Sequence, residues 1–370
     1  MWAPGPDRTV DDCITLGRVT IKPAHRRIVT ILVGVVVLVV FLVAGMTLRV
    51  PYVALGPGPT VNTIGESPDG DRVVRVDGAV DPDPKGHLNL TTVSVHDGLT
   101  LFQSLGMWVS GSYELQPRET YYPPDQSEDE VRRQNDEQMA GSEIDATTAA
   151  LTYLKMPSAV GVAAVAEKGP SAGKIKPFDR IVAVGGTPVN DAESAIAEIG
   201  DHAPGESVDV TLQRGPRRLV ESVTLGRGST PKKGERERGT LGVTIMPMSA
   251  DPNVNIRFNV GQIGGPSAGL MLTLSLIDYM TPGDLSHDTF VAGTGTIKTD
   301  GRVGAIGGIQ HKIKAADEAG ASIFLVPEDN CSEAVAGAPD DIELVKVGTL
   351  TDAVTALGTI GSDKSRPHCS

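Results

Sequence analysis

The stretch IGGPSAGLMLTLSLID, residues 263–278, decides the fold of the C-terminal part of this chain. Its last nine residues are apolar on nearly all faces of a helix, which is typical of a helix buried in a core. Pro266 suits the first helical position, where its missing N–H costs nothing. Ser267 then lies at the positive end of a buried helix, beside Gly264 and Gly265, where free N–H groups could hold an oxyanion. The alternative is a serine that only caps the helix.

The pentapeptide GPSAG occurs twice, at residues 169–173 and at residues 265–269. Each copy fits the GxSxG pattern of a nucleophile elbow, so the pattern alone cannot assign a site. Pro177 interrupts any helix after the first copy, and Ser171 is therefore predicted to be a turn residue. Only the second copy leads into a buried helix.

A serine nucleophile needs a base, which is histidine in the elbow pattern and lysine in the other known arrangement. Three histidines are available without a supporting context: His287, His311 and His368. The segment GGIQHKIKAADEAG, residues 307–320, predicts a helix on which Lys312 shares a face with Ile309. Burial there would lower the pKa of the amine, which could then accept a proton from serine. The alternative is a lysine whose stem packs while its head reaches water.

Residues 28–48, IVTILVGVVVLVVFLVAGMTL, carry no charge and match the length of a helix that crosses a bilayer. Arg18, Lys22, Arg26 and Arg27 precede this span, and only Arg49 follows it before Arg72; residues 1–27 carry a net charge of +2 and the rest of the chain −15. The positive-inside rule therefore places residues 1–27 in the cytoplasm and everything after residue 50 outside. The alternative is a cleaved signal peptide, whose apolar region is usually about 7–15 residues long.

Composition excludes several classes of protein. The chain has 370 residues, of which 40% are hydrophobic, which argues against a largely disordered chain. With 33 basic and 46 acidic residues it lacks the basic face of a nucleic-acid binder. Three cysteines offer no paired spacing for zinc, and no metal or cofactor is expected. On the exported side Cys331 and Cys369 could form one disulfide or remain free thiols, while Cys13 is on the other face.

Composition shifts divide the exported chain into blocks. A β-rich segment ends in a long helix that Ser127 is predicted to cap, and Pro157 stops that helix. A block of short strands with one helix follows, then a linker of Gly, Ser and charged residues, a block with two helices, and a polar tail. The predicted boundaries are 51–157, 158–225, 226–239, 240–360 and 361–370.

Three stretches resemble the proteolytic domain of Lon-type serine peptidases: residues 263–278, 293–321 and 324–331. That resemblance implies a Ser–Lys dyad, with Ser267 in the PSAG box and Lys312 in the GGxxxK helix. It also implies that Thr294 hydrogen-bonds the lysine and orients its amine. The backbone around Ser267 would form the oxyanion hole, with Gly265, Pro266 and Ala268 as its supporting residues.

Residues 158–225 resemble a PDZ domain, mainly through GKIKPFDRIVAVGGTPV, although Phe178-Asp179 stands where the family usually has Gly-Asp. The order of blocks resembles the bacterial membrane-anchored, PDZ-containing Lon-like serine peptidases of the YlbL type. The expected fold class is α+β, with an N-terminal transmembrane helix, a small β-rich block with a helix, a PDZ-like domain and a Lon-type proteolytic domain. Because the chain contains no GxxxxGK[ST] loop, ATP is not expected as a partner.

The leading hypothesis is an ATP-independent serine endopeptidase on the outer face of a bacterial cell membrane, held there by a single-pass helix. Its partners would be loosely folded or delivered proteins or peptides, and it could form a homo-oligomer. One alternative is a catalytically idle, membrane-anchored adaptor whose PDZ-like domain binds protein partners. Another is a conventional Ser–His hydrolase.

Overall fold

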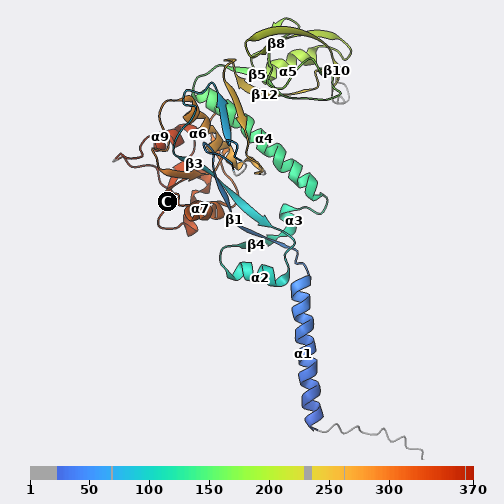
Figure 1. The fold of residues 1–370 in the computed structure, drawn as a ribbon, viewed down its shortest axis with the longest axis vertical. Helices are drawn as coiled ribbons and strands as arrows, with labels where there is room; N and C mark the ends of the chain where they lie inside the picture. The colour runs from blue at the N-terminus through green and yellow to red at the C-terminus, as the bar shows by residue number, and fades with distance from the viewer. Residues whose placement is uncertain (1–22, 68–69, 229–235, 262, 363) are drawn as a thin grey trace, which may run out of the picture.

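The computed structural model describes residues 23–67, 70–228, 236–261, 263–362 and 364–370. Its first element, α1 (Pro23–Thr47), projects alone from the rest of the molecule in Figure 1. By length and composition, Arg27–Thr47 could cross a membrane, and only 6% of its most apolar window is buried. Residues 1–22 of the expected cytoplasmic stub lie outside the described residues.

A six-stranded sheet forms the centre of the molecule, in the order β18-β17-β14-β3-β1-β4. Its strands are β1 (Tyr52–Asn62), β3 (His87–His96), β4 (Glu114–Pro117), β14 (Phe290–Gly293), β17 (Ile323–Pro327) and β18 (Glu343–Val347). Strands β3, β14, β17 and β18 run parallel, whereas β1 is antiparallel to both of its neighbours. Every residue of β17 is buried, as expected for a strand covered on both faces.

Helices cover both faces of the central sheet. On one face α4 (Glu128–Tyr153), α6 (Gly269–Met280) and α9 (Leu350–Leu357) share a core with Ile323 and Leu325 of β17. On the other face α7 (Ile309–Glu318) packs with Phe324 and Val326 of the same strand. Successive side chains of a strand point to opposite faces, so β17 contributes to both cores.

The central sheet joins two segments that were predicted as separate blocks, residues 51–157 and residues 240–360. Strands β1 and β3 belong to residues 51–157, whereas β14, β17 and β18 belong to residues 240–360, and β3 pairs directly with β14. A second link is the two-stranded sheet of β2 (Val74–Asp77) and β13 (Asn255–Phe258). The two segments differ in the composition of their loops. Their strands nevertheless form one sheet, and the apolar faces of that sheet are buried only when both segments contribute. Helix α4 begins after Ser127, which caps it as predicted by accepting from the Glu130 N–H.

A second sheet, in the order β12-β5-β6-β8-β9, lies at the opposite end of the molecule from α1 (Figure 1). Its strands are β5 (Ser158–Val165), β6 (Arg180–Val184), β8 (Ser207–Arg214), β9 (Arg217–Thr224) and β12 (Val243–Ser249), with β7 (Thr187–Pro188) beside β6. This sheet and α5 (Ala192–Asp201) enclose a separate apolar core. Strand β12 lies beyond the predicted linker, so the sheet includes a strand that composition assigns to the next block.

The predicted linker, residues 226–239, begins and ends in a short pair of strands, β10 (Gly226–Arg227) and β11 (Gly239–Thr240). Residues 229–235 between them lie outside the described residues. Elsewhere the short elements are α2 (Leu101–Val109), α3 (Arg118–Tyr121), β15 (Thr296–Ile297), β16 (Val303–Gly304), and the 3-10 helices η1 (Pro266–Ala268), η2 (Glu328–Asn330) and η3 (Val335–Gly337).

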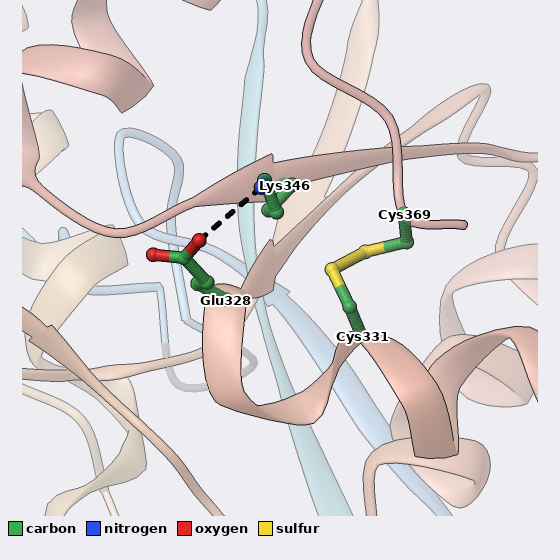
Figure 2. Close-up of a disulfide and its surroundings, with 4 residues drawn as sticks. All are labelled: Glu328, Cys331, Lys346 and Cys369. Atoms are coloured by element: carbon green, nitrogen blue, oxygen red, sulfur yellow. Dashed lines mark hydrogen bonds and ion pairs between the residues drawn. A yellow bond between two sulfur atoms is a disulfide. The ribbon is translucent and has the colours of Figure 1, made fainter.

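A disulfide between Cys331 and Cys369 ties the C-terminal tail to the body of the molecule (Figure 2). Cys331 begins α8 (Cys331–Ala334), and the Cys369 N–H donates to the Leu344 carbonyl of β18 at 3.2 Å. The structure thus contains the disulfide rather than the two free thiols that the sequence left as an alternative. Figure 2 also shows the ion pair between Glu328 and Lys346 nearby, at 3.2 Å.

Candidate active site

Ser267 lies at the turn where the chain enters α6. Gly265 adopts a positive φ of 87°, which favours glycine, and Pro266 begins the 3-10 helix η1. Helix α6 follows directly, and every residue from Gly269 to Tyr279 is buried. Ser267 itself is half-buried, so its side chain sits on a rigid support and still reaches the cavity beside it.

Lys312 lies on the face of α7 that points into the molecule. Its neighbours Ile309, Ile313 and Ala316 are buried, as the predicted stripe requires, and Lys312 is only 3% exposed. Its Nζ lies 3.1 Å from Ser267 Oγ and donates to the Thr91 carbonyl at 2.7 Å. Burial lowers the pKa of the amine from 10.5 to about 8. The alternative interpretation requires the lysine head to reach bulk water, and the buried position of Lys312 excludes this.

Thr294 lies at this site, but its hydrogen bond differs from the one that the resemblance implies. Its Oγ1 donates to the Ser267 carbonyl at 3.1 Å, and the Gly295 N–H donates to the same oxygen at 2.9 Å. These two bonds fix the backbone of the serine. The amine of Lys312 is held instead by the Thr91 carbonyl of β3.

Helix α4 supports the serine turn from the other side. The Gly265 N–H donates to the Asn135 carbonyl at 3.0 Å, and Ser142 Oγ donates to the Pro266 carbonyl at 3.1 Å. The Gly265 N–H is thus engaged and Pro266 has no N–H, so neither can donate to an oxyanion. Their contribution is the shape of the turn. The next backbone N–H groups along the turn are those of Ser267 and Ala268.

A cavity of about 790 Å³ lies beside Ser267 and Lys312. Its walls come from separate parts of the chain: Thr91–Val93 of β3, Tyr121 of α3, Asn135 and Gln138 of α4, Ile263–Ala268, and Ala305–Gly307. Nothing lies within 4 Å of the position that a Cβ on Gly265 would take, so the space next to the serine turn is open. An extended peptide could enter here and reach the hydroxyl.

The histidines that the sequence offered do not line this cavity. His311 is on α7, near Glu114 at 3.5 Å, and His368 lies in the tail near Glu343 at 3.7 Å. His287 is in the loop after α6, with a positive φ of 47°. Ser171 of the first GPSAG copy lies in a turn, as predicted, and its hydroxyl is buried away from the cavity.

Among the described residues no three His, Cys, Asp or Glu side chains are grouped so that they could hold an ion. The side chains that reach the cavity next to Ser267 are those of Lys312 and neutral residues, which suits proton transfer and nucleophilic attack.

Comparison with known proteins assigns two parts of the chain to known domain families. A sequence model of the Lon protease (S16) C-terminal proteolytic domain matches residues 250–354, and a PDZ domain model matches residues 130–225. Lon protease 2 of Bacillus subtilis (strain 168) is 31% identical over 138 residues, which are 37% of this chain and 24% of that protein. Lon protease of Campylobacter concisus (strain 13826) is 33% identical over 94 residues, or 24% of this chain and 11% of that protein. The chain thus spans a quarter or less of the length of these relatives.

Solved structures of two PDZ domains are also similar to part of the chain. The PDZ domain of an SdrC-like protein from Listeria monocytogenes is 21% identical and covers 24% of this chain and 86% of its own, with a TM-score of 0.20. The corresponding domain from Listeria innocua is 22% identical and covers 24% and 92%, with a TM-score of 0.21.

The chain therefore combines a Lon-type serine peptidase domain with a PDZ domain. Among the described residues one helix is both long and apolar enough to cross a membrane, so the chain fits a PDZ-containing Lon-like peptidase that has an N-terminal membrane anchor.

The hydrogen bond from Thr294 predicts how a substitution there acts. Thr294→Val removes the bond to the Ser267 carbonyl, which is worth about 1 kcal/mol, so kcat for peptide cleavage should fall about 5- to 10-fold. The midpoint of the pH profile should stay in place, because the Lys312 amine is held by Thr91. Steady-state kinetics of the full chain across pH measure both effects. A shifted midpoint would instead assign Thr294 to the amine.

Proposed function

We propose that this chain is an ATP-independent, membrane-anchored serine endopeptidase that cleaves loosely folded or delivered extracytoplasmic proteins with a Ser267–Lys312 dyad. The observation that carries the proposal is the 3.1 Å separation between Lys312 Nζ and Ser267 Oγ at a buried amine. A lysine with a pKa lowered to about 8 is partly neutral at physiological pH and can act as a base.

The mechanism follows from the positions of these groups. Ser267 Oγ attacks the peptide carbonyl while its proton passes to Lys312 Nζ. The resulting ammonium donates the proton to the leaving amine, and an acyl-enzyme remains on Ser267. A water molecule then attacks the ester while Lys312 takes its proton, and the ammonium returns that proton to Ser267 Oγ as the ester bond breaks and the carboxylic product leaves. The Thr91 carbonyl accepts an N–H of Lys312 throughout and keeps the amine aimed at the serine.

The oxyanion of the tetrahedral intermediate would be held by backbone donors at η1. Ser267 and Ala268 are the proposed donors, since the Gly265 N–H is bonded to Asn135 and Pro266 has none. The two bonds that fix the Ser267 carbonyl and the one that fixes the Pro266 carbonyl keep these N–H groups in place. Such preorganised donors are effective because they need no rearrangement during the reaction.

Independence from ATP is proposed because the chain contains no GxxxxGK[ST] loop. Without a motor, substrates must reach the cavity already extended. The PDZ domain is proposed to select or position them. Its β12 lies at one edge of the second sheet, next to α5, so an extended peptide could add there as a further strand.

The extracytoplasmic location is proposed from three features. α1 contains an apolar span long enough to cross a bilayer, and four basic residues stand just before residues 28–48, against Arg49 alone just after them. The disulfide between Cys331 and Cys369 lies beyond α1 in the chain, and disulfides persist in oxidising compartments. All three support a peptidase domain on the outer side of the cell membrane.

Paired substitutions test the dyad. Ser267→Ala and Lys312→Met should each lower kcat/KM for casein or peptide cleavage by about 10³-fold or more, because the two side chains act as one unit. Two matched controls should keep the wild-type rate. Ser171→Ala changes the serine of the other GPSAG copy, and Lys314→Met changes a lysine of the same helix that faces Ser112.

The alternatives predict different results in the same assay. An idle adaptor would show no cleavage above background with the wild-type chain. A Ser–His hydrolase would lose turnover with His287→Ala or His311→Ala and keep it with Lys312→Met. Either pattern contradicts the dyad.

The pH dependence of cleavage tests the base itself. Only the neutral amine of Lys312 can accept a proton, so kcat/KM should rise with pH through about 8 and then level off. Between that value and 10.5 the unfolded chain binds more protons at this lysine, so its contribution to the free energy of unfolding rises with pH. Below about 8 both states bind this proton and the contribution no longer changes, so an unfolding curve recorded at each pH separates protonation of the base from loss of the fold. A limb centred at about pH 6.5 would point to histidine instead.

A further inference from the structure

Helix α2 presents large apolar side chains to the outside. The exposed fractions of Leu101, Leu105, Trp108 and Val109 are 42%, 48%, 62% and 71%. Their spacing of i, i+4, i+7 and i+8 places them on one face of the helix. The polar Ser104 is buried. A helix on a water-exposed body normally shows the reverse pattern, so this face needs an apolar partner.

The start of α2 is bonded to the chain that leaves α1. The Val50 N–H donates to the Leu99 carbonyl at 2.9 Å, and Arg49 forms an isolated β-bridge with Thr100. α2 therefore begins where α1 ends. Figure 1 shows α2 lying crosswise beside that end of α1.

A second contact sets the depth of α2 along α1. The Phe102 ring packs edge-on against Phe41, with 5.7 Å between the ring centroids. Gly45 admits Phe102, because a Cβ there would lie 2.4 Å from its Cε2 atom. Phe41 is six residues before the end of α1 at Thr47, which corresponds to about 9 Å along the helix axis. Phe102 thus contacts α1 within its apolar span.

We infer that α2 is a membrane-interface helix, whose exposed face lies at the boundary between headgroups and acyl chains on the side where α1 leaves the bilayer. The inference rests on the proposed function, in which α1 spans the membrane. Interfacial helices are buried about 5–10 Å into this boundary, which agrees with the depth that Phe41 gives. Trp108 suits the boundary because its ring is apolar and its N–H is polar.

The partner is the bilayer surface itself. Residues 101–109 carry no charge, so α2 would bind through apolar area and would not select anionic headgroups. A second copy of the chain could cover the same face only by lying at the depth of Phe41, inside the acyl region.

The membrane contact would orient the peptidase. Ser112, three residues after α2, accepts a hydrogen bond from Lys314 Nζ of α7 at 2.9 Å. β4 follows and pairs with β1. α2 is thereby joined to the helix that carries Lys312, and its seat on the bilayer would fix the height and tilt of the cavity above the membrane.

Trp108 provides the probe for this inference. The chain has two tryptophans, and Trp2→Phe leaves Trp108 as the single one. The full chain with this change is reconstituted into phosphatidylcholine liposomes whose acyl chains carry bromine at a shallow or a deep carbon. Trp108 emission should be quenched, and more strongly by the shallow bromine. Emission that bromine leaves unchanged in liposome-bound protein overturns the inference, whether water or a second copy covers the face.

Flotation and peptide cleavage distinguish this inference from two earlier proposals, the membrane anchor α1 and the Ser267–Lys312 dyad. A chain that does not float with the liposomes overturns the anchor and, with it, the interfacial helix. Peptide cleavage by the same preparation reports the dyad independently of either.

A matched pair of charged variants adds a second test. Leu105→Glu with Val109→Glu should abolish most of the quenching, while α1 still carries the chain to the liposomes. Val220→Glu changes a valine on β9 whose exposed fraction of 59% lies between those of Leu105 and Val109, and it should leave the quenching unchanged. Full quenching in the double variant would overturn the inference, because charged side chains could not remain in the acyl boundary.

Discussion

Lys312 gives up almost all of its hydration to lie beside Ser267, and the rest of the candidate site is arranged around this desolvated amine. A fall in pKa from 10.5 to about 8 corresponds to about 3 kcal/mol of disfavoured charge. The fold offsets that penalty by packing α7 through Ile309, Ile313 and Ala316, and it gives the amine the Thr91 carbonyl as a partner. The amine is thus held where its neutral form can take a proton.

That arrangement needs strands from two segments of the chain after α1, residues 51–157 and 240–360. Thr91 lies in the middle of β3 and Thr294 follows β14, and the parallel pairing of these two strands brings both residues beside the serine turn. Helix α4 adds Asn135 and Ser142, which hold the other side of the turn. The residues that resemble Lon proteases therefore depend on the segment before them, and the site is complete only when β3 and β14 pair.

Much of the site can be predicted from the sequence, because the apolar pattern of two helices indicates where Lys312 and Ser267 lie. Lys312 falls with Ile309 and Ile313 on one stripe, and Ser267 precedes a run that is apolar on every face. Thr91 acts through its backbone carbonyl, which leaves no signal in its side chain. The partner of Thr294 could not be predicted either, since only tertiary packing brings its hydroxyl to the Ser267 carbonyl. The place of β12 in the second sheet was not predicted for a similar reason. β12 pairs with β5 although the predicted linker, residues 226–239, separates them in the chain.

The central claim is that Ser267 is a nucleophile activated by Lys312. A peptidyl phosphonate ester, which captures an activated serine covalently, tests it most directly when the adduct of the full chain is mapped and timed by mass spectrometry. We expect an adduct on Ser267, and we expect the labelling rate of Lys312→Met to be about 10³-fold lower than that of the wild-type chain. An adduct on another residue, or wild-type labelling of Ser267 without Lys312, would contradict it.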